Sequence, residues 1–273
     1  MKKWLPFTLI LASLPLAAGV RIQMEDTDLS DNSTTPSEIL IDATRFRVNL
    51  PDTSMMFVNE NGGKIMVLNK ERNEVRVVDK ATMERMSNAL NGAMAQLQEQ
   101  MAKMPPEQRA MMERMMKGKM KGMLGAAGAP AAEPVRTEYT NTGDATVNGF
   151  SCTNYQGTRQ GQVVADVCAT DPANLHLTTA EFAVFDDMRN FVKSLTDALA
   201  KSPMGAMAGA FTNPIADQGF QGFPVERYTY EDGKRVRRDA VTSVEEASFT
   251  DTDFSFGDAK QVDLIPPGSI PGQ

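Results

Sequence analysis

The sequence is poor in the residues that most catalytic and metal sites use. Its 273 residues include one histidine, His176, and two cysteines, Cys152 and Cys168. A Ser-His-Asp or Cys-His site would have to use His176, which lies between two leucines just before an expected helix cap. Zinc sites take three or four His, Cys or carboxylate ligands at suitable spacing, and acidic residues beside a cap or in a turn are ordinarily solvated. We therefore expect no enzyme, no metal and no cofactor.

Basic residues and long apolar runs are also scarce. Lys and Arg number 28 against 35 Asp and Glu, which gives a net charge of −7. Such a chain lacks the basic surface of a nucleic-acid-binding protein. No segment approaches the roughly 20 apolar residues of a membrane-spanning helix, so the protein is not expected to span a membrane.

The first 19 residues have the pattern of a secretory signal peptide. Two lysines precede an apolar stretch, and small residues then allow cleavage after Ala18 or Gly19. No cysteine lies near this point, so a lipid anchor is not expected. The sequence predicts an exported, periplasmic protein of the bacterial envelope.

The two cysteines lie in complementary segments. Residues 149–159 and 162–169 resemble the strands of a hairpin, and a three-residue loop centred on Gln160 places Cys152 directly opposite Cys168. This register predicts a disulfide on the more polar side of the hairpin, worth about 3 kcal/mol. The alternative is a redox-active pair, which ordinarily has closer spacing such as Cys-x-x-Cys.

Alternating apolar and polar residues predict strands over much of the chain. Turn residues separate the segments, and Asp-Gly at 232–233 is a strong hairpin signal. The stretch 26–37 is polar and acidic and is expected to be a loop. The expected strands are 20–24, 39–50, 54–59, 64–69, 74–79 and a final hairpin over 225–244.

Two segments have helical periodicity instead. Apolar residues recur every three or four positions from Met83 to Met104, and a second short helix follows Pro105-Pro106. Together they form a Met-rich helical insertion at 81–123, followed by an Ala/Gly/Pro linker at 125–134. A third helix is expected after the capping box Thr178/Glu181.

These elements predict an α+β fold. One domain covers 20–257, and it consists of a curved antiparallel sheet, or half-open β-barrel, with helices packed on its concave side. The Pro/Gly-rich tail 258–273 is expected to be disordered.

Several motifs resemble one bacterial envelope family. Thr146-Val147-Asn148-Gly149-Phe150-Ser151-Cys152-Thr153-Asn154-Tyr155 is similar to the core of the domain of unknown function numbered 4412, as are Met104 to Arg109, Asp171-Pro172 and Gly222 to Val225. The resemblance extends from about Val20 to Gly257. It implies a fold similar to the LolA/LolB-type lipoprotein carriers, whose half-open barrel binds acyl chains. No functional residue follows from it.

The methionines are the remaining functional signal, since eleven of the 19 fall between positions 83 and 123. They allow three interpretations: helix packing on the sheet, an adaptable apolar surface for a ligand or partner, or Cu(I) capture by thioethers. We favour binding of an apolar small molecule or lipid, with an envelope protein partner as the alternative. The candidate ligand-binding residues are Met101, Met104, Met111, Met112, Met115, Met116, Phe211 and Phe220.

Overall fold

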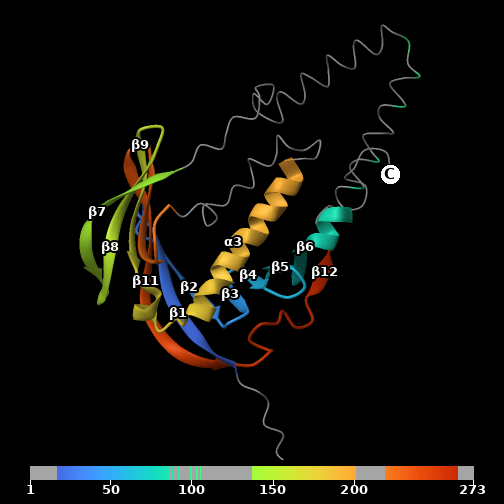
Figure 1. The fold of residues 1–273 in the computed structure, drawn as a ribbon, viewed down its shortest axis with the longest axis horizontal. Coiled ribbons are helices and arrows are strands. Elements are labelled where there is room, and N and C mark those ends of the chain that lie inside the picture. Colours follow the sequence, from blue (N-terminus) through green and yellow to red (C-terminus); the bar gives the residue numbers. More distant parts are fainter. Residues whose placement is uncertain are drawn as a thin grey trace, which may run out of the picture.

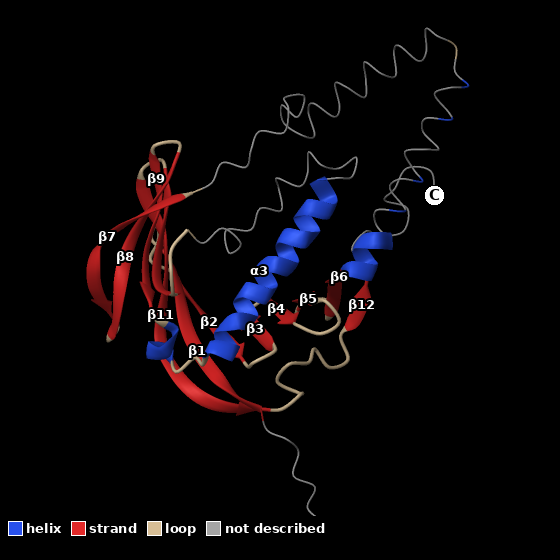
Figure 2. Cartoon of the chain, viewed as in Figure 1, coloured by secondary structure: helices blue, strands red, loops and turns tan. Residues whose placement is uncertain are grey.

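The computed structural model describes residues 17–85, 137–200 and 219–263, with isolated positions 88, 92, 99, 103 and 105. Within these residues the protein is mostly β-sheet, with one long helix (Figures 1 and 2). The strands are β1 (Ala17–Asp28), β2 (Thr34–Ile41), β3 (Arg45–Asn49), β4 (Thr53–Val58), β5 (Lys64–Asn69), β6 (Glu74–Asp79), β7 (Glu138–Val147), β8 (Phe150–Arg159), β9 (Gln162–Thr170), β10 (Phe223–Glu231), β11 (Lys234–Phe249) and β12 (Lys260–Val262). The helices with both bounds described are the 3-10 helix η1 (Pro172–Leu175) and α3 (Thr179–Ala200), and residues 80–85 begin a further helix.

All twelve strands belong to one open sheet. Their order is β12-β6-β5-β4-β3-β2-β1-β11-β10-β9-β8-β7, and every described pair is antiparallel except β12 with β6. Figure 1 shows the sheet curving around α3. The expected curved antiparallel sheet is confirmed, although the alternation of apolar and polar residues does not predict β7 and β12.

The chain end is more ordered than expected. Residues 260–262 form β12 on the edge of β6, and the Lys260 N–H donates to the Asn73 carbonyl at 2.9 Å. The prediction of a disordered tail from residue 258 is therefore wrong over these positions, because backbone pairing with β6 holds the segment. Residues 264–273 lie outside the described residues.

The first two hairpins differ from the expected strand boundaries. The predicted strand 39–50 is broken at Asp42, whose carboxylate accepts hydrogen bonds from the N–H groups of Thr44 and Arg45 at 2.9 and 2.7 Å. The predicted loop 26–37 is mostly strand, since β1 runs to Asp28 and β2 begins at Thr34. Asn32, with φ 59°, supplies the turn. Local side-chain hydrogen bonds, which alternation does not reveal, set these boundaries.

The predicted disulfide between Cys152 and Cys168 is confirmed, with Cα atoms 5.5 Å apart. Its register is wrong. Gln160 and Gly161 both have positive φ, so the turn has two residues rather than three, and a bulge follows. Asn154 therefore opposes Cys168, and Cys152 lies diagonal to it. Both cysteines belong to the principal core, not to the polar side of the hairpin.

The principal core lies between α3 and the sheet. The Phe46 ring stacks on Phe185 with centroids 5.1 Å apart, and Phe57 packs against Phe191 at 5.9 Å. The predicted capping box begins this helix: the Glu181 N–H donates to Thr178 at 3.2 Å. Burial of this apolar stripe, rather than helix propensity alone, stabilises α3.

A second core covers the opposite face of β2–β4. Phe249 and Phe254 pack edge to face there, with centroids 5.4 Å apart, and contact a cluster that includes Leu40 and Met56. The guanidinium of Arg45 lies over Phe254 at 4.3 Å. The segment after β11 is thereby fixed on the sheet before it reaches β12.

The Met-rich insertion is described only at its beginning and at isolated positions. Residues 80–85 are helical, as are positions 88, 92, 99 and 103, whereas position 105 is not. These positions agree with the predicted helix from Met83 to Met104. The second short helix, the linker 125–134 and the residues around them lie outside the described residues.

Candidate functional site

Of the eight predicted ligand-binding residues, the structure describes Phe220 alone. Its half-buried ring packs edge to face on Tyr139 at 5.0 Å and lies 5.8 Å from the ring of Tyr155. Phe220 therefore has a defined apolar environment. The other seven, Met101, Met104, Met111, Met112, Met115, Met116 and Phe211, lie outside the described residues.

The three rings cover a patch of small side chains on β9, and we call this cluster the aromatic clasp. Its floor is Ala165, Val167 and Ala169, which are 1%, 1% and 5% exposed. The clasp is separate from the two larger cores. It consists of Tyr139, Tyr155 and Phe220 over Ala165, Val167 and Ala169.

Glycines allow the clasp rings to approach the backbone closely. Gly157 lies directly opposite Tyr139, and a Cβ there would be 2.8 Å from the tyrosine ring. Gly219 would place a Cβ 3.1 Å from the same ring. Gly222, with φ 95°, brings the chain against the carbonyl of Thr170 just before β10. These glycines fix the strap 219–222 across the end of β9.

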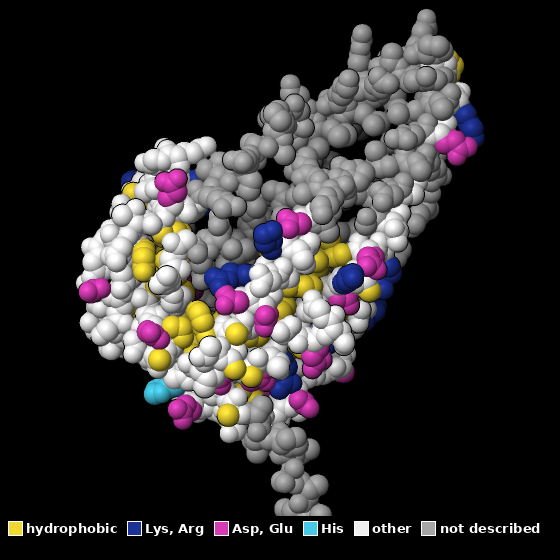
Figure 3. Space-filling view, in the orientation of Figure 1, with side chains coloured by type: hydrophobic (Ala, Val, Ile, Leu, Met, Phe, Trp, Pro, Cys, Tyr) yellow, Lys and Arg dark blue, Asp and Glu magenta, His cyan; other side chains and the backbone are white. Residues whose placement is uncertain are grey.

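Both long insertions return to the sheet at the clasp. Residues 106–136 precede Thr137 and Tyr139, and residues 201–218 precede Gly219 and Phe220. A Cβ on Gly219 would lie 3.6 Å from the Thr137 carbonyl oxygen, so the two re-entry points are adjacent. Figure 3 shows hydrophobic side chains along α3 and on the strands beside it.

The space between α3 and the sheet is filled. Phe46, Phe57, Val184 and Met188 are at most 2% exposed and belong to one contiguous core. The half-open barrel that the family resemblance implies is therefore filled at α3, because these side chains and the phenylalanine rings of α3 occupy that volume. Sequence periodicity predicts which side chains point inward but not how completely they fill the space.

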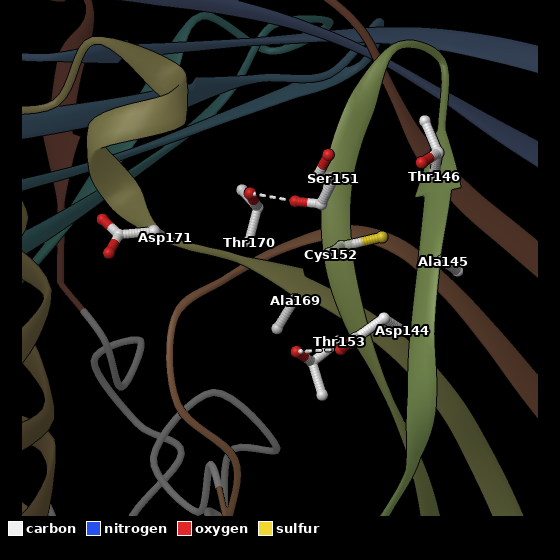
Figure 4. Close-up of a pocket in the computed structure, with 9 residues that line it drawn as sticks. All are labelled: Asp144, Ala145, Thr146, Ser151, Cys152, Thr153, Ala169, Thr170 and Asp171. Atoms are coloured by element: carbon white, nitrogen blue, oxygen red, sulfur yellow. Dashed lines mark hydrogen bonds between the residues drawn. The ribbon is translucent and has the colours of Figure 1, made fainter.

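A polar pocket lies on the strands β7–β9 (Figure 4). Its volume is about 480 Å³, and it is open to solvent. Thr153 donates to Asp144 at 3.2 Å, and Thr170 donates to the Ser151 carbonyl at 2.6 Å. Its lining is too polar for an acyl chain. It comprises Asp144, Ala145, Thr146, Ser151, Cys152, Thr153, Ala169, Thr170 and Asp171.

A charged network lies on the other side of β9 from the clasp floor. Asp166 accepts hydrogen bonds from Tyr230 Oη and Arg235 Nη2, both at 2.6 Å. Burial raises the pKa of Asp166, but these hydrogen bonds outweigh it and hold the pKa below its usual range. Burial and the Asp166 contact raise the pKa of Tyr230. The network keeps the carboxylate ionised and links β9 to the β10–β11 hairpin.

Acidic residues and the lone histidine have structural partners. His176 is exposed, ends η1 with φ 58° and lies 3.7 Å from Glu246. Asp186 pairs with Arg189, and Glu181 serves the helix cap. Across the described residues, no group of three or more His, Cys, Asp or Glu side chains could hold a metal ion. None of the described helices is long and apolar enough to cross a membrane.

The family follows from the sequence match. Residues 52–258 match the family model described as Domain of unknown function (DUF4412). The chain belongs to the DUF4412 family. This match includes the disulfide hairpin, α3, the strap and the β10–β11 hairpin, so the clasp lies within the DUF4412 domain. No curated protein matches the sequence.

Solved structures resemble this DUF4412 protein at low identity. An uncharacterized conserved protein from Thermus thermophilus matches with a TM-score of 0.42 and 8% identity, over 89% of each chain. The Pseudomonas aeruginosa MucA/MucB complex matches with a TM-score of 0.33 and 9% identity, over 92% of this chain and 62% of that one. PNGF-II matches with a TM-score of 0.38 and 8% identity, over 91% of this chain and 31% of that one.

Proposed function

We propose that this chain is a non-enzymatic periplasmic binding protein that receives an apolar ligand of the acyl-chain class at the aromatic clasp. The observation that carries the proposal is the clasp itself: Ala165, Val167 and Ala169 form an apolar floor that is covered by rings. One of those rings, Phe220, belongs to a four-residue strap rather than to a strand. A ligand that takes the place of Phe220 would find a ready apolar surface.

The exported location is part of the same proposal. The signal-like first 19 residues support it, and so does the disulfide between Cys152 and Cys168, because such bonds persist in oxidising compartments. The periplasm also exposes proteins to lipids and lipoproteins in transit across the envelope. A binding site for acyl chains suits that setting.

Opening of the strap requires a modest free energy. Phe220 makes two ring contacts, each worth about 0.5–1.5 kcal/mol beyond area burial. The two contacts total about 1–3 kcal/mol, and the burial of the ring adds to this, so at most about 15% of molecules are in the open state. A ligand that makes apolar contacts with the floor can offset the free energy of opening. The contacts of Phe220 in the closed form are therefore compatible with ligand binding at this place.

The filled interface beneath α3 favours a second candidate function. A protein whose helix and sheet form a closed core offers its partner an outer surface, and an envelope protein would then dock on the Met-rich segment or on the clasp face. This alternative predicts stable complexes with protein and no bound lipid. It needs no displacement of Phe220.

Native mass spectrometry of the mature protein, purified gently from its own periplasm, tests the proposal. We expect a reproducible bound apolar molecule that organic extraction releases. Phe220→Ala removes the ring that the ligand must displace and is expected to raise ligand occupancy at least threefold, whereas Phe256→Ala, which alters a half-buried phenylalanine of the separate second core, should leave it unchanged.

An apo mass at several expression levels would contradict ligand binding. Cross-linking in intact cells would then identify the envelope partner that the second candidate requires. Circular dichroism of both variants establishes that the domain is folded before occupancies are compared.

A further inference from the structure

One guanidinium lies beside the floor of the clasp. Arg227 on β10 is directly opposite Val167 on β9, and Val167 is directly opposite Tyr155 on β8. Directly opposite residues of antiparallel strands share one face of the sheet. The guanidinium group of Arg227 therefore lies at the edge of the clasp floor, and the apolar surface of the floor extends from there toward β7.

Acidic residues on the far side of Arg227 are paired with another arginine. Asp239 on β11 is opposite Arg227, and Asp26 on β1 is opposite Asp239. Arg237 approaches both acids, at 3.4 Å from Asp239 and in close contact with Asp26. Within the part of the chain that the structure describes, Arg227 forms no ion pair.

The Nε atom of Arg227 is buried and has no hydrogen-bond partner among the described residues. A buried donor without an acceptor is unfavourable in a folded protein, and an arginine binds carboxylates and phosphates through strong charge-assisted hydrogen bonds. An anionic group at this position would satisfy the donor. The neighbouring acids cannot readily do so while they contact Arg237.

We propose that the ligand of the clasp is an anionic amphiphile, whose carboxylate or phosphate group binds Arg227 while its apolar chain lies along the clasp floor. This inference rests on the proposed function and names its ligand class. From β10 to β7 the face spans three interstrand steps of about 4.8 Å, roughly 14 Å in all. A medium-length acyl chain has that reach, so head and tail can bind at the same time.

Isothermal titration calorimetry with three probes tests the inference on the purified mature chain. Laurate carries both chain and anion, methyl laurate carries the chain without charge, and inorganic phosphate carries the anion without a chain. We expect Arg227→Gln to weaken laurate binding about 10-fold or more, because hydrogen bonds to a charged group are lost. Methyl laurate should bind the variant and the unaltered chain equally, and phosphate should bind neither.

Arg235→Gln is the matched control, since it removes the same charge from the β10–β11 hairpin but from an arginine that pairs with Asp166 on the other side of β9 from the clasp floor. We expect less than a threefold change in laurate affinity. Arg227→Lys keeps the charge and should recover most of the affinity, which separates anion binding from a general loss of packing. Circular dichroism compares the folding of all three variants.

The outcomes separate this inference from the proposed function. Equal binding of laurate and methyl laurate that is insensitive to Arg227→Gln overturns the anionic head site and leaves the apolar site intact. No binding of either laurate or its ester overturns the proposed function itself. Phosphate binding as tight as that of laurate, and lost in Arg227→Gln, overturns the amphiphile in favour of a free anion.

Discussion

Loss of the disulfide is the perturbation whose size is easiest to work out. The bond joins Cys152 and Cys168, which are 16 residues apart and at most 7% exposed. Closing a loop of this length restricts the unfolded chain, which corresponds to about 3 kcal/mol of stabilisation at 25 °C. The double substitution to alanine also removes two buried sulfur atoms from the core, so we expect a total loss of about 3–5 kcal/mol.

Urea unfolding followed by far-ultraviolet circular dichroism measures this loss. The only tryptophan is Trp4, within the predicted signal peptide, so a protein cleaved after that peptide would have no tryptophan fluorescence with which to follow unfolding. The midpoint should fall while the folded spectrum is retained. Chemical reduction of the unaltered protein is the control, since it opens the same loop without removing atoms.

The reasoning would be refuted by a loss below about 1 kcal/mol in both the reduced protein and the alanine variant. Such a result would mean that the hairpin is equally restricted in the unfolded state, or that the surrounding core does not depend on it. A large loss in the alanine variant with none on reduction would instead assign the stabilisation to packing of the sulfurs.

Three other substitutions test single contacts. Asp166→Asn should cost about 1–2 kcal/mol of stability at pH 7. Folding lowers the pKa of the Asp166 carboxyl, so this stability is present above the unfolded pKa and is lost as the pH falls through the folded pKa. Urea unfolding at pH 7 and pH 2.5 should therefore show that the stability difference between the variant and the unaltered protein shrinks at the lower pH. Glu181→Ala removes the capping box and should cost about 1–2 kcal/mol, with faster amide hydrogen exchange in the first turn of α3. Gly222→Ala should lower stability by roughly 2 kcal/mol or more, because Gly222 has φ 95° and lies against a backbone carbonyl. Gly233→Ala, in an open turn, should cost less. Thermal unfolding of the two variants compares these losses.

The sequence predicts well those features that local chemistry determines. The capping box Thr178/Glu181 and the Asp232-Gly233 turn are confirmed because each depends on a few adjacent residues. The disulfide pairing is confirmed because only two cysteines are present. Its register is wrong because a turn at Gln160 and Gly161 and a single-residue bulge shift the strands, and alternation patterns tolerate both.

The candidate site depends on contacts between distant parts of the chain. Phe220 is an apolar residue outside the strands, and its role in ligand binding stays a prediction; its neighbours Tyr139, Gly157 and Val167 come from three separate strands. Their proximity follows from the strand order, which no local pattern gives. Arg227 has even less signal, because an arginine in an alternating strand is ordinarily solvent-facing. The floor residues Ala165, Val167 and Ala169 alternate with Asp166 and Cys168 in the sequence, which indicates a strand but not which rings cover it.

The short strand β12 has a consequence for self-association. Without residues 260–262, β6 would present the unpaired N–H and C=O groups of residues 74–76, and such an edge pairs readily with another chain. At the opposite margin, β7 is polar and kinked at Gly143, which discourages the same pairing. The three residues of β12 thus cover the edge of β6 and prevent a second molecule from pairing with it. A protein shortened before Lys260 is expected to aggregate even though its core is complete.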